Sequence, residues 1–318
     1  MIDMRSLYRR FVWAVFALAV TAALLRTPAL CLFFDRTVGY CDPNPFSTLL
    51  YIVIALFLLL CVAYAVAAPR CERKQRLAVA PDPTAESRLV RAASLLTALT
   101  FIAAAIGEAA LSSAASNPAR LRMLGAVLAA VYFAVGKKQK LILLGLGAHL
   151  YCVFVLISEY FDWTIPMNSP LKIMQQIAMI AALLFMTAEL SHLNGSRRSV
   201  RYTVCAALAA FFGLSNGVSL IAACLVGGIV RSDMLLHSLP ALAIALYAAS
   251  RLFVSHSIDI PVDLGDIPSE LLKDPDDTAL DSEKPLTPED NNATTADTMV
   301  PAPQTPPMTP EEEDTSHG

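Results

Sequence analysis

Long apolar runs, separated by short polar or charged segments, occupy the chain as far as residue 254. A helix needs about 20 residues to cross ~30 Å of hydrocarbon, and most of these runs have that length. The pattern therefore predicts an all-α polytopic transmembrane helix bundle of about eight spans. The predicted spans are residues 10–33, 47–68, 89–112, 121–136, 141–158, 170–190, 202–230 and 235–254.

Helix-breaking and helix-starting residues place several of these boundaries. Pro69 is expected to end the second span, and Pro118 to break the chain before the fourth. Ser169 and Pro170 are a good N-cap and first helical residue for the sixth span. The seventh run carries glycines within residues 213–217, so one tilted helix and a broken helix both remain open.

The first apolar run has the basic start of a signal peptide, with Arg5, Arg9 and Arg10 before it. No Ala-x-Ala cleavage site follows, and Arg26 and Pro28 interrupt the region where one is expected. We therefore predict an uncleaved first helix, with cleavage as the alternative.

Composition supports a membrane protein, because 56% of the 318 residues are hydrophobic and only 16% are charged. Charge is divided unevenly along the chain. Residues 1–254 hold 22 basic and 11 acidic residues, a net charge of +11, whereas residues 255–318 hold 2 basic and 16 acidic residues, a net charge of −14. The second segment also has ten prolines and few aromatic residues, which predicts a disordered acidic tail.

The distribution of basic residues between loops predicts the orientation. Loops expected on one side of the membrane hold 14 Lys and Arg residues, and those on the other side hold five. By the positive-inside rule, both termini are cytoplasmic and the protein lies in the cell membrane. Of the seven cysteines, only Cys31 and Cys41 are then expected near the oxidising exterior, and whether they form a disulfide stays open.

The sixth predicted span carries a polar stripe along an apolar helix. At 100° per residue, Lys172, Gln175 and Glu189 share one face with Met179, Ala182 and Met186. Such a face is expected to turn toward protein or water and away from lipid. Near the predicted cytoplasmic end, Glu189 is interpreted as an interfacial ion-pair partner, close to His192 and the arginines that follow, with a buried proton carrier as the alternative.

Several other polar residues lie inside the predicted spans, where each has a cost and invites a functional interpretation. The candidate substrate-binding residues are Gln175, Asn216, Glu108, Glu159, His149 and His237. Asn216 and His149 are expected near the middle of the membrane, whereas Glu108, Glu159, Gln175 and His237 are expected at or toward the outer side, with Arg122 beside them. They form either a pocket open to the exterior or separate helix ends that reach interfacial water.

For two of the candidates, His149 and Asn216, the sequence allows a functional and a structural interpretation. His149, with Cys152 one turn away, offers only two metal ligands, which favours a packing histidine over a metal site. Asn216 lies between Gly213 and Gly217, a pattern typical either of tight helix packing or of an unwound segment that binds a solute.

No motif of a known enzyme class is present, and no cofactor, metal or nucleic-acid partner is predicted. Beyond the lipid bilayer, we expect a small solute or ion as the ligand, which predicts binding or transport. The alternative is a membrane sensor or scaffold whose acidic tail recruits a cytosolic protein.

Overall fold

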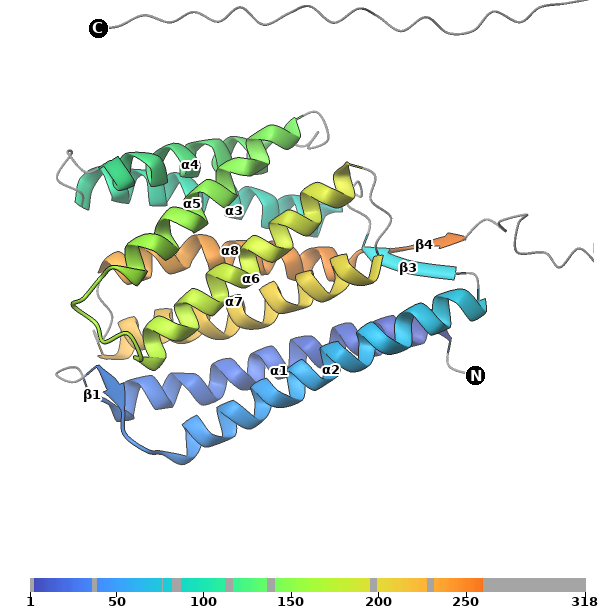
Figure 1. Cartoon of the computed structure of the whole chain (residues 1–318), viewed down its shortest axis with the longest axis horizontal. Coiled ribbons are helices and arrows are strands. Elements are labelled where there is room, and N and C mark those ends of the chain that lie inside the picture. Colours follow the sequence, from blue (N-terminus) through green and yellow to red (C-terminus); the bar gives the residue numbers. More distant parts are fainter. Residues whose placement is uncertain are drawn as a thin grey trace, which may run out of the picture. The chain divides into compact units, whose positions relative to one another are not determined.

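In the part of the chain that the structure describes, eight helices run alternately up and down (Figure 1). The computed structural model describes residues 3–35, 39–75, 77–81, 87–111, 117–135, 141–194, 199–227 and 232–259. The helices are α1 (Met4–Phe33), α2 (Pro45–Gln75), α3 (Arg88–Leu111), α4 (Asn117–Ala134), α5 (Ile142–Tyr160), α6 (Pro170–Leu193), α7 (Ser199–Gly227) and α8 (Ser232–Phe253). The predicted all-α bundle is confirmed.

Seven of the described helices are long and apolar enough to cross a membrane. The exception is α4, which has 18 residues and carries Arg120 and Arg122 near its start. The protein is therefore a multi-pass membrane protein in which α4 packs beside the seven candidate spans, against α3 and α5.

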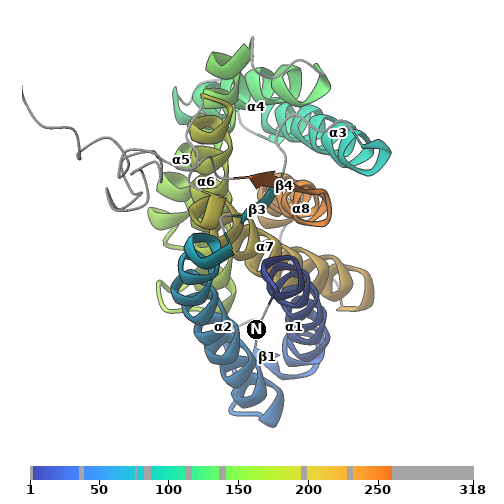
Figure 2. The ribbon, with the colours of Figure 1, turned by 90° about the vertical axis from the view of Figure 1, so that its right-hand side faces the viewer.

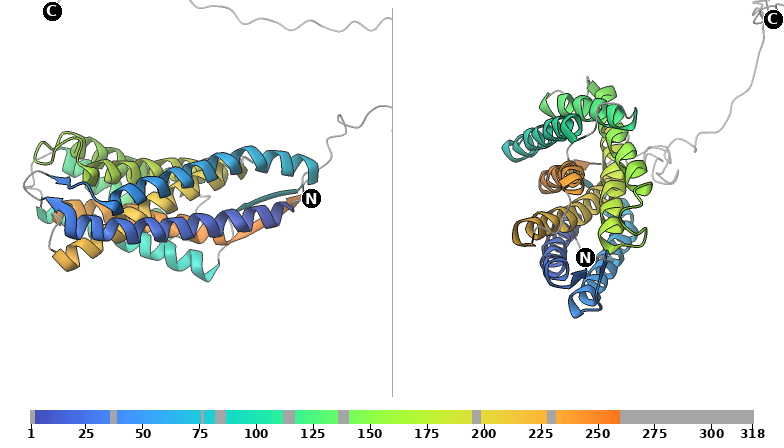
Figure 3. Two further views of the ribbon diagram at one scale, coloured as in Figure 1. Left: turned by 90° about the horizontal axis from the view of Figure 1, so that it is seen from below. Right: turned by 90° about the vertical axis from the view of Figure 1, so that its left-hand side faces the viewer.

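The helices form two rows when the bundle is seen end-on (Figure 2, and Figure 3, right). One row is α1, α7, α8 and α3, in which each helix packs against the next. On the other side, α6 packs against α7 and α5, and α4 joins α5 to α3. Because α6, α7 and α8 meet at the centre, their polar residues can lie inside the protein (Figure 1).

In the described part of the chain two pairs of short strands, which the hydropathy pattern does not predict, mark the two ends of the bundle. Strands β1 (Phe34–Asp35) and β2 (Tyr40–Cys41) pair between α1 and α2, at what we call the β1 end. At the opposite β3 end, β3 (Leu77–Pro81) pairs antiparallel with β4 (Ser255–Asp259). Residues 255–259 thus form a strand where the tail was expected to begin, and the rest of the predicted tail lies outside the described residues.

The predicted helix boundaries need two corrections. Pro69 does not end α2, which continues to Gln75, because a proline removes only one helical hydrogen bond and neighbouring residues keep theirs. Ser169 takes the extended N-cap conformation before Pro170, as predicted, but its side chain makes no capping hydrogen bond. The open question about the seventh run is resolved, because α7 is one continuous helix of 29 residues.

The polar stripe of α6 faces the protein interior, as its spacing predicts. All six residues of the stripe are buried: Lys172, Gln175, Met179, Ala182, Met186 and Glu189. In contrast, large apolar side chains on α2, α3 and α5 are exposed, among them Leu59, Leu99 and Leu143. The bundle is therefore polar in parts of its centre and apolar on its surface, as a lipid environment requires.

Candidate functional site

A buried ion pair joins α3 to α4 at the β1 end of the bundle. The guanidinium of Arg122 donates from Nε to Glu108 Oε1 and from Nη2 to Glu108 Oε2, both at 2.8 Å. This bidentate geometry is the strong form of an arginine–carboxylate pair. It balances the charge of Glu108, which is 4% exposed.

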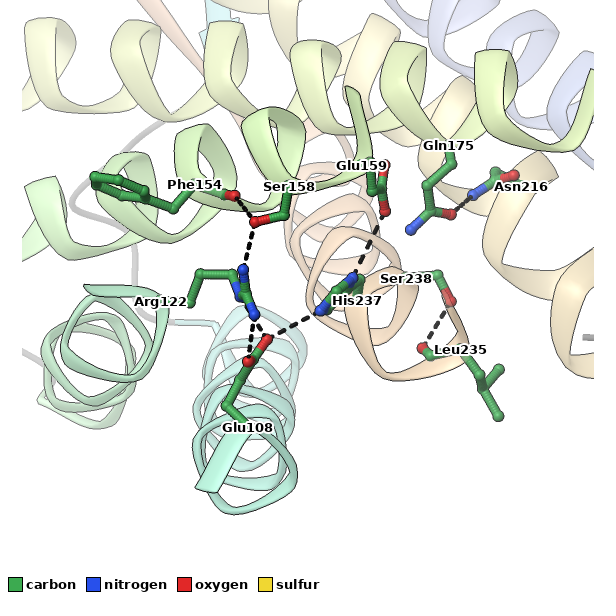
Figure 4. A network of polar contacts seen from close by, with 10 residues as sticks. All are labelled: Glu108, Arg122, Phe154, Ser158, Glu159, Gln175, Asn216, Leu235, His237 and Ser238. Carbon is green, nitrogen blue, oxygen red and sulfur yellow. Dashed lines mark hydrogen bonds and ion pairs between the residues drawn. The ribbon is translucent and has the colours of Figure 1, made fainter. Parts of the chain in front are cut away.

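His237 of α8 links this pair to a second carboxylate. Its Nε2 lies 2.9 Å from Glu108 Oε1, and its Nδ1 lies 3.7 Å from Oε1 of Glu159 on α5. Arg122 Nη1 also donates to the hydroxyl of Ser158, which in turn donates to the Phe154 carbonyl. We call Glu108, Arg122, Ser158, Glu159 and His237 the Glu108 cluster (Figure 4).

Glu159 is the least satisfied member of the Glu108 cluster. Its side chain is 9% exposed, and neither carboxylate oxygen has a hydrogen-bond partner within the described part of the chain. The ion pair with His237 is its contact with the cluster. Burying a carboxylate without hydrogen bonds costs free energy. Both oxygens of Glu159 can therefore accept hydrogen bonds from a ligand.

Two amides form a second polar unit beside the cluster. Asn216 Nδ2 of α7 donates to Gln175 Oε1 of α6 at 2.7 Å, and both side chains are buried. Gln175 Nε2 and Asn216 Oδ1 have no hydrogen-bond partner among the described residues. Amide oxygen and nitrogen can be exchanged in both residues together, but either assignment leaves one N–H group and one carbonyl unpaired.

The cluster and the amide pair lie in one region of the bundle. In Figure 4 the amide nitrogen of Gln175 is turned toward the side where Glu159 and His237 lie, and its oxygen faces Asn216. Five of the six predicted site residues are thus at the same end, in contact as two groups. Their joint role as a ligand site stays a prediction.

His149, the sixth candidate, lies elsewhere. Its Nε2 is 3.0 Å from the Thr187 hydroxyl of α6, and its Nδ1 is 3.4 Å from the Gly145 carbonyl. These contacts are those of a histidine that packs between two helices. Lys172 makes its contacts in the α5–α6 loop, where its ammonium donates to the Asp162 carbonyl at 2.8 Å.

A second buried cluster lies toward the β3 end and corrects the interpretation of Glu189. This residue is fully buried and accepts hydrogen bonds from the hydroxyls of Tyr202 and Tyr247. Its cationic partner is Arg251 of α8, whose Nη2 lies 3.5 Å from Glu189 Oε1. The interfacial pairing predicted with His192 and the following arginines is wrong, because Glu189 faces α7 and α8 inside the bundle.

Sequence reasoning missed several residues of these clusters. Ser158 and Tyr202 carry no signal that separates them from ordinary helix residues. Tyr247 and Arg251 are four residues apart and therefore share one face of α8. An arginine within an apolar run is unusual, so the sequence could have identified this pair as candidates.

The chemistry available at the β1 end is binding and proton exchange. No group of three or more His, Cys, Asp or Glu side chains is placed to hold a metal ion in the region that the structure describes. Carboxylate, imidazole and amide groups instead offer donors and acceptors to a polar ligand. Together, the fold and these groups define a multi-pass helical membrane protein with a buried polar site.

Comparison with known protein families, with curated proteins and with solved structures finds no match to this chain. The geometry of the polar residues is therefore the basis for a functional proposal.

Proposed function

We propose that this membrane protein binds a small polar solute or an ion at the Glu108 cluster and the amide pair, as a step in moving it across the membrane. The observation that carries the proposal is the buried Glu159 carboxylate, whose two oxygens have no hydrogen-bond partner among the described residues. Intramembrane carboxylates of this kind mark ion and proton pathways in membrane proteins.

The charges of the cluster favour a cationic ligand or ligand group. Glu108 and Glu159 face His237 from α3 and α5, and Arg122 faces Glu108 from α4. With a protonated imidazole, two negative and two positive charges balance. With a neutral imidazole, one negative charge remains, which a bound cation would compensate. A cation at Glu159 can therefore take the place of the His237 proton.

The amide pair adds neutral hydrogen bonds next to this charge. The unpaired carbonyl of Asn216 accepts a hydrogen bond or contacts a cation, and the unpaired N–H of Gln175 donates to an oxygen. Because both groups are buried, a ligand that forms hydrogen bonds with them would offset the desolvation cost of these unpaired atoms.

Thermal unfolding of the purified protein in lipid nanodiscs tests the proposal. Sodium, potassium, methylammonium and choline chlorides are titrated separately. At 100 times its Kd a bound ion adds about 2.7 kcal/mol, so the unfolding midpoint is expected to rise by roughly 5 °C or more. Glu159→Gln and Gln175→Ala should remove the rise, while Gln176→Ala, the neighbouring amide on α6, should keep it.

Vesicle flux of the stabilising cation then tests transport, with internal pH recorded by a trapped dye. Cation entry coupled to proton exit is expected for the wild type and not for Glu159→Gln. If no cation stabilises the protein, or if the variants respond like the wild type, the proposed site is incorrect.

A further inference from the structure

Arg26 is a further buried cation near the β1 end of the bundle. Arg26 of α1 is 3% exposed, and its Nε and Nη2 atoms have no hydrogen-bond acceptor in the described segments. It lies seven residues before the end of α1, which is about 10 Å at 1.5 Å per residue. Nothing in the proposed cation site uses this residue.

The packing at this end places Arg26 in a defined layer. Leu30 of α1, Leu171 of α6 and Leu220 of α7 pack together in one apolar cluster, which also includes Ala223 and Met234. Arg26, Gln175 and Asn216 each lie four residues, or one helical turn, deeper than one of these leucines. The hydrogen bond between Gln175 and Asn216 shows that the deeper positions of α6 and α7 do meet.

Among the described residues, the groups that interact electrostatically with Arg26 are a thiol and a phenol, and neither is a carboxylate. Its guanidinium interacts electrostatically with the Cys41 thiol and the Tyr51 phenol. Burial raises the pKa of the Cys41 thiol, although Arg26 lowers it in part, so the thiol stays protonated and neutral at pH 7. A buried guanidinium with neutral neighbours is an uncompensated charge, which proteins rarely keep without a partner.

We propose that Arg26 binds the carboxylate or phosphate group of a ligand beneath the apolar cluster of Leu30, Leu171 and Leu220. Guanidinium N–H groups match the oxygens of both anions, and two of them are available here. The anion can belong to a soluble molecule or to a lipid headgroup, since Arg26 lies near the end of a membrane helix and its neighbour Tyr51 is 63% exposed. This site lies in the same layer as the amide pair, but its charged group, Arg26, is not part of the proposed cation site.

Thermal unfolding in nanodiscs tests Arg26 directly. In the first arm, N-methylglucamine phosphate or acetate is added to the protein in phosphatidylcholine discs, with N-methylglucamine chloride as the control. In the second arm, the protein in phosphatidylglycerol discs is compared with the protein in phosphatidylcholine discs. Arg26→Gln should abolish the stabilisation that the wild type shows, and Arg10→Gln, at an exposed position of the same helix, should keep it. A response to the soluble anions identifies a solute, and a response only to phosphatidylglycerol identifies a lipid.

Two results would overturn the proposal. One is the absence of any Arg26-dependent stabilisation in both arms. The other is a large fall in the midpoint of Arg26→Gln in maltoside micelles, which carry no phosphate headgroup, without added phosphate or acetate; this would mean that Arg26 is paired within the chain. If the charge is uncompensated, Arg26→Gln without added anion should unfold at the same temperature as the wild type or at a higher one. Glu159→Gln should retain the anion response, which separates this site from the cation site.

Discussion

At the scale of single residues, the bidentate pair of Glu108 and Arg122 should be strongly coupled. Removing one partner of a buried pair leaves a charge without compensation and costs about 3–5 kcal/mol. Glu108→Gln and Arg122→Gln should each lower the unfolding free energy by about 3 kcal/mol, and the double variant by clearly less than the sum. Unfolding in mixed detergent micelles measures all three, and additive losses would contradict the coupling.

In the second cluster, substitution of Glu189 should cost the most stability. This carboxylate accepts hydrogen bonds from two tyrosine hydroxyls and forms an ion pair with Arg251. Glu189→Gln is expected to cost about 3 kcal/mol, and Tyr202→Phe about 2 kcal/mol for one hydrogen bond to a charged group. Tyr151→Phe is the matched control, since this buried hydroxyl has no hydrogen-bond partner in the described residues. Equal losses for all three variants would show that these hydrogen bonds are unimportant.

Helix spacing predicted which residues share a depth but not which helices meet. Glu108, Glu159 and His237 could be placed at one end because depth follows from counting along each helix. The partners of Glu189 could not, since they depend on the packing of α6 against α7 and α8. For Arg26 the sequence indicates only an interruption of a possible signal peptide. Its burial depends on how other helices pack against α1, which the sequence does not show.

At the scale of helices, the crossing of α4 and α5 depends on two glycines that face each other. A Cβ on Gly147 would lie 2.5 Å from Leu128 Cβ and 2.7 Å from the backbone nitrogen of Ala129. A Cβ on Gly125 would lie 2.7 Å from the backbone nitrogen of Tyr151. Backbone atoms cannot yield as a side chain does, so the two helices would have to separate.

Gly147→Ala should therefore lower the unfolding free energy by about 1–3 kcal/mol, the usual cost of overpacking. Gly145→Ala on the same helix is the control, because its Cβ would meet the flexible end of Leu190. Thermal unfolding in nanodiscs compares the two. Equal midpoints for both variants would show that the α4–α5 contact is not tight.

Hydropathy predicted every described helix because the apolar runs are long. Two local features were predicted incorrectly: the end of α2 and the presence of strands β3 and β4. Pro69 was given too much weight, since its neighbours are good helix formers. Strands β3 and β4 were missed because five-residue segments carry little periodicity, and their pairing joins residues far apart in the chain. Long elements were thus predictable, whereas contacts between distant segments were not.

At the scale of the whole molecule, deletion of residues 260–318 separates binding from scaffolding. This deletion keeps β4, which pairs with β3, and removes most of the acidic segment. Cation stabilisation should be unchanged in the truncated protein if the site lies within the helices. Loss of a cytosolic partner in a pull-down, with no cation response in either form, would favour the sensor or scaffold alternative.

The orientation of the bundle follows from the charges at its two ends. Counted by loops, 14 Lys and Arg residues belong to the β3 side and five to the β1 side, so we expect the β3 end to be cytoplasmic. Trp163, 75% exposed between α5 and α6, reports on the β1 end, and Asn194, exposed after α6, reports on the β3 end. In intact cells a membrane-impermeant maleimide should label Trp163→Cys and spare Asn194→Cys, with the unsubstituted protein correcting for native thiols. Labelling of Asn194→Cys alone would reverse the orientation and place the Glu108 cluster toward the cytoplasm.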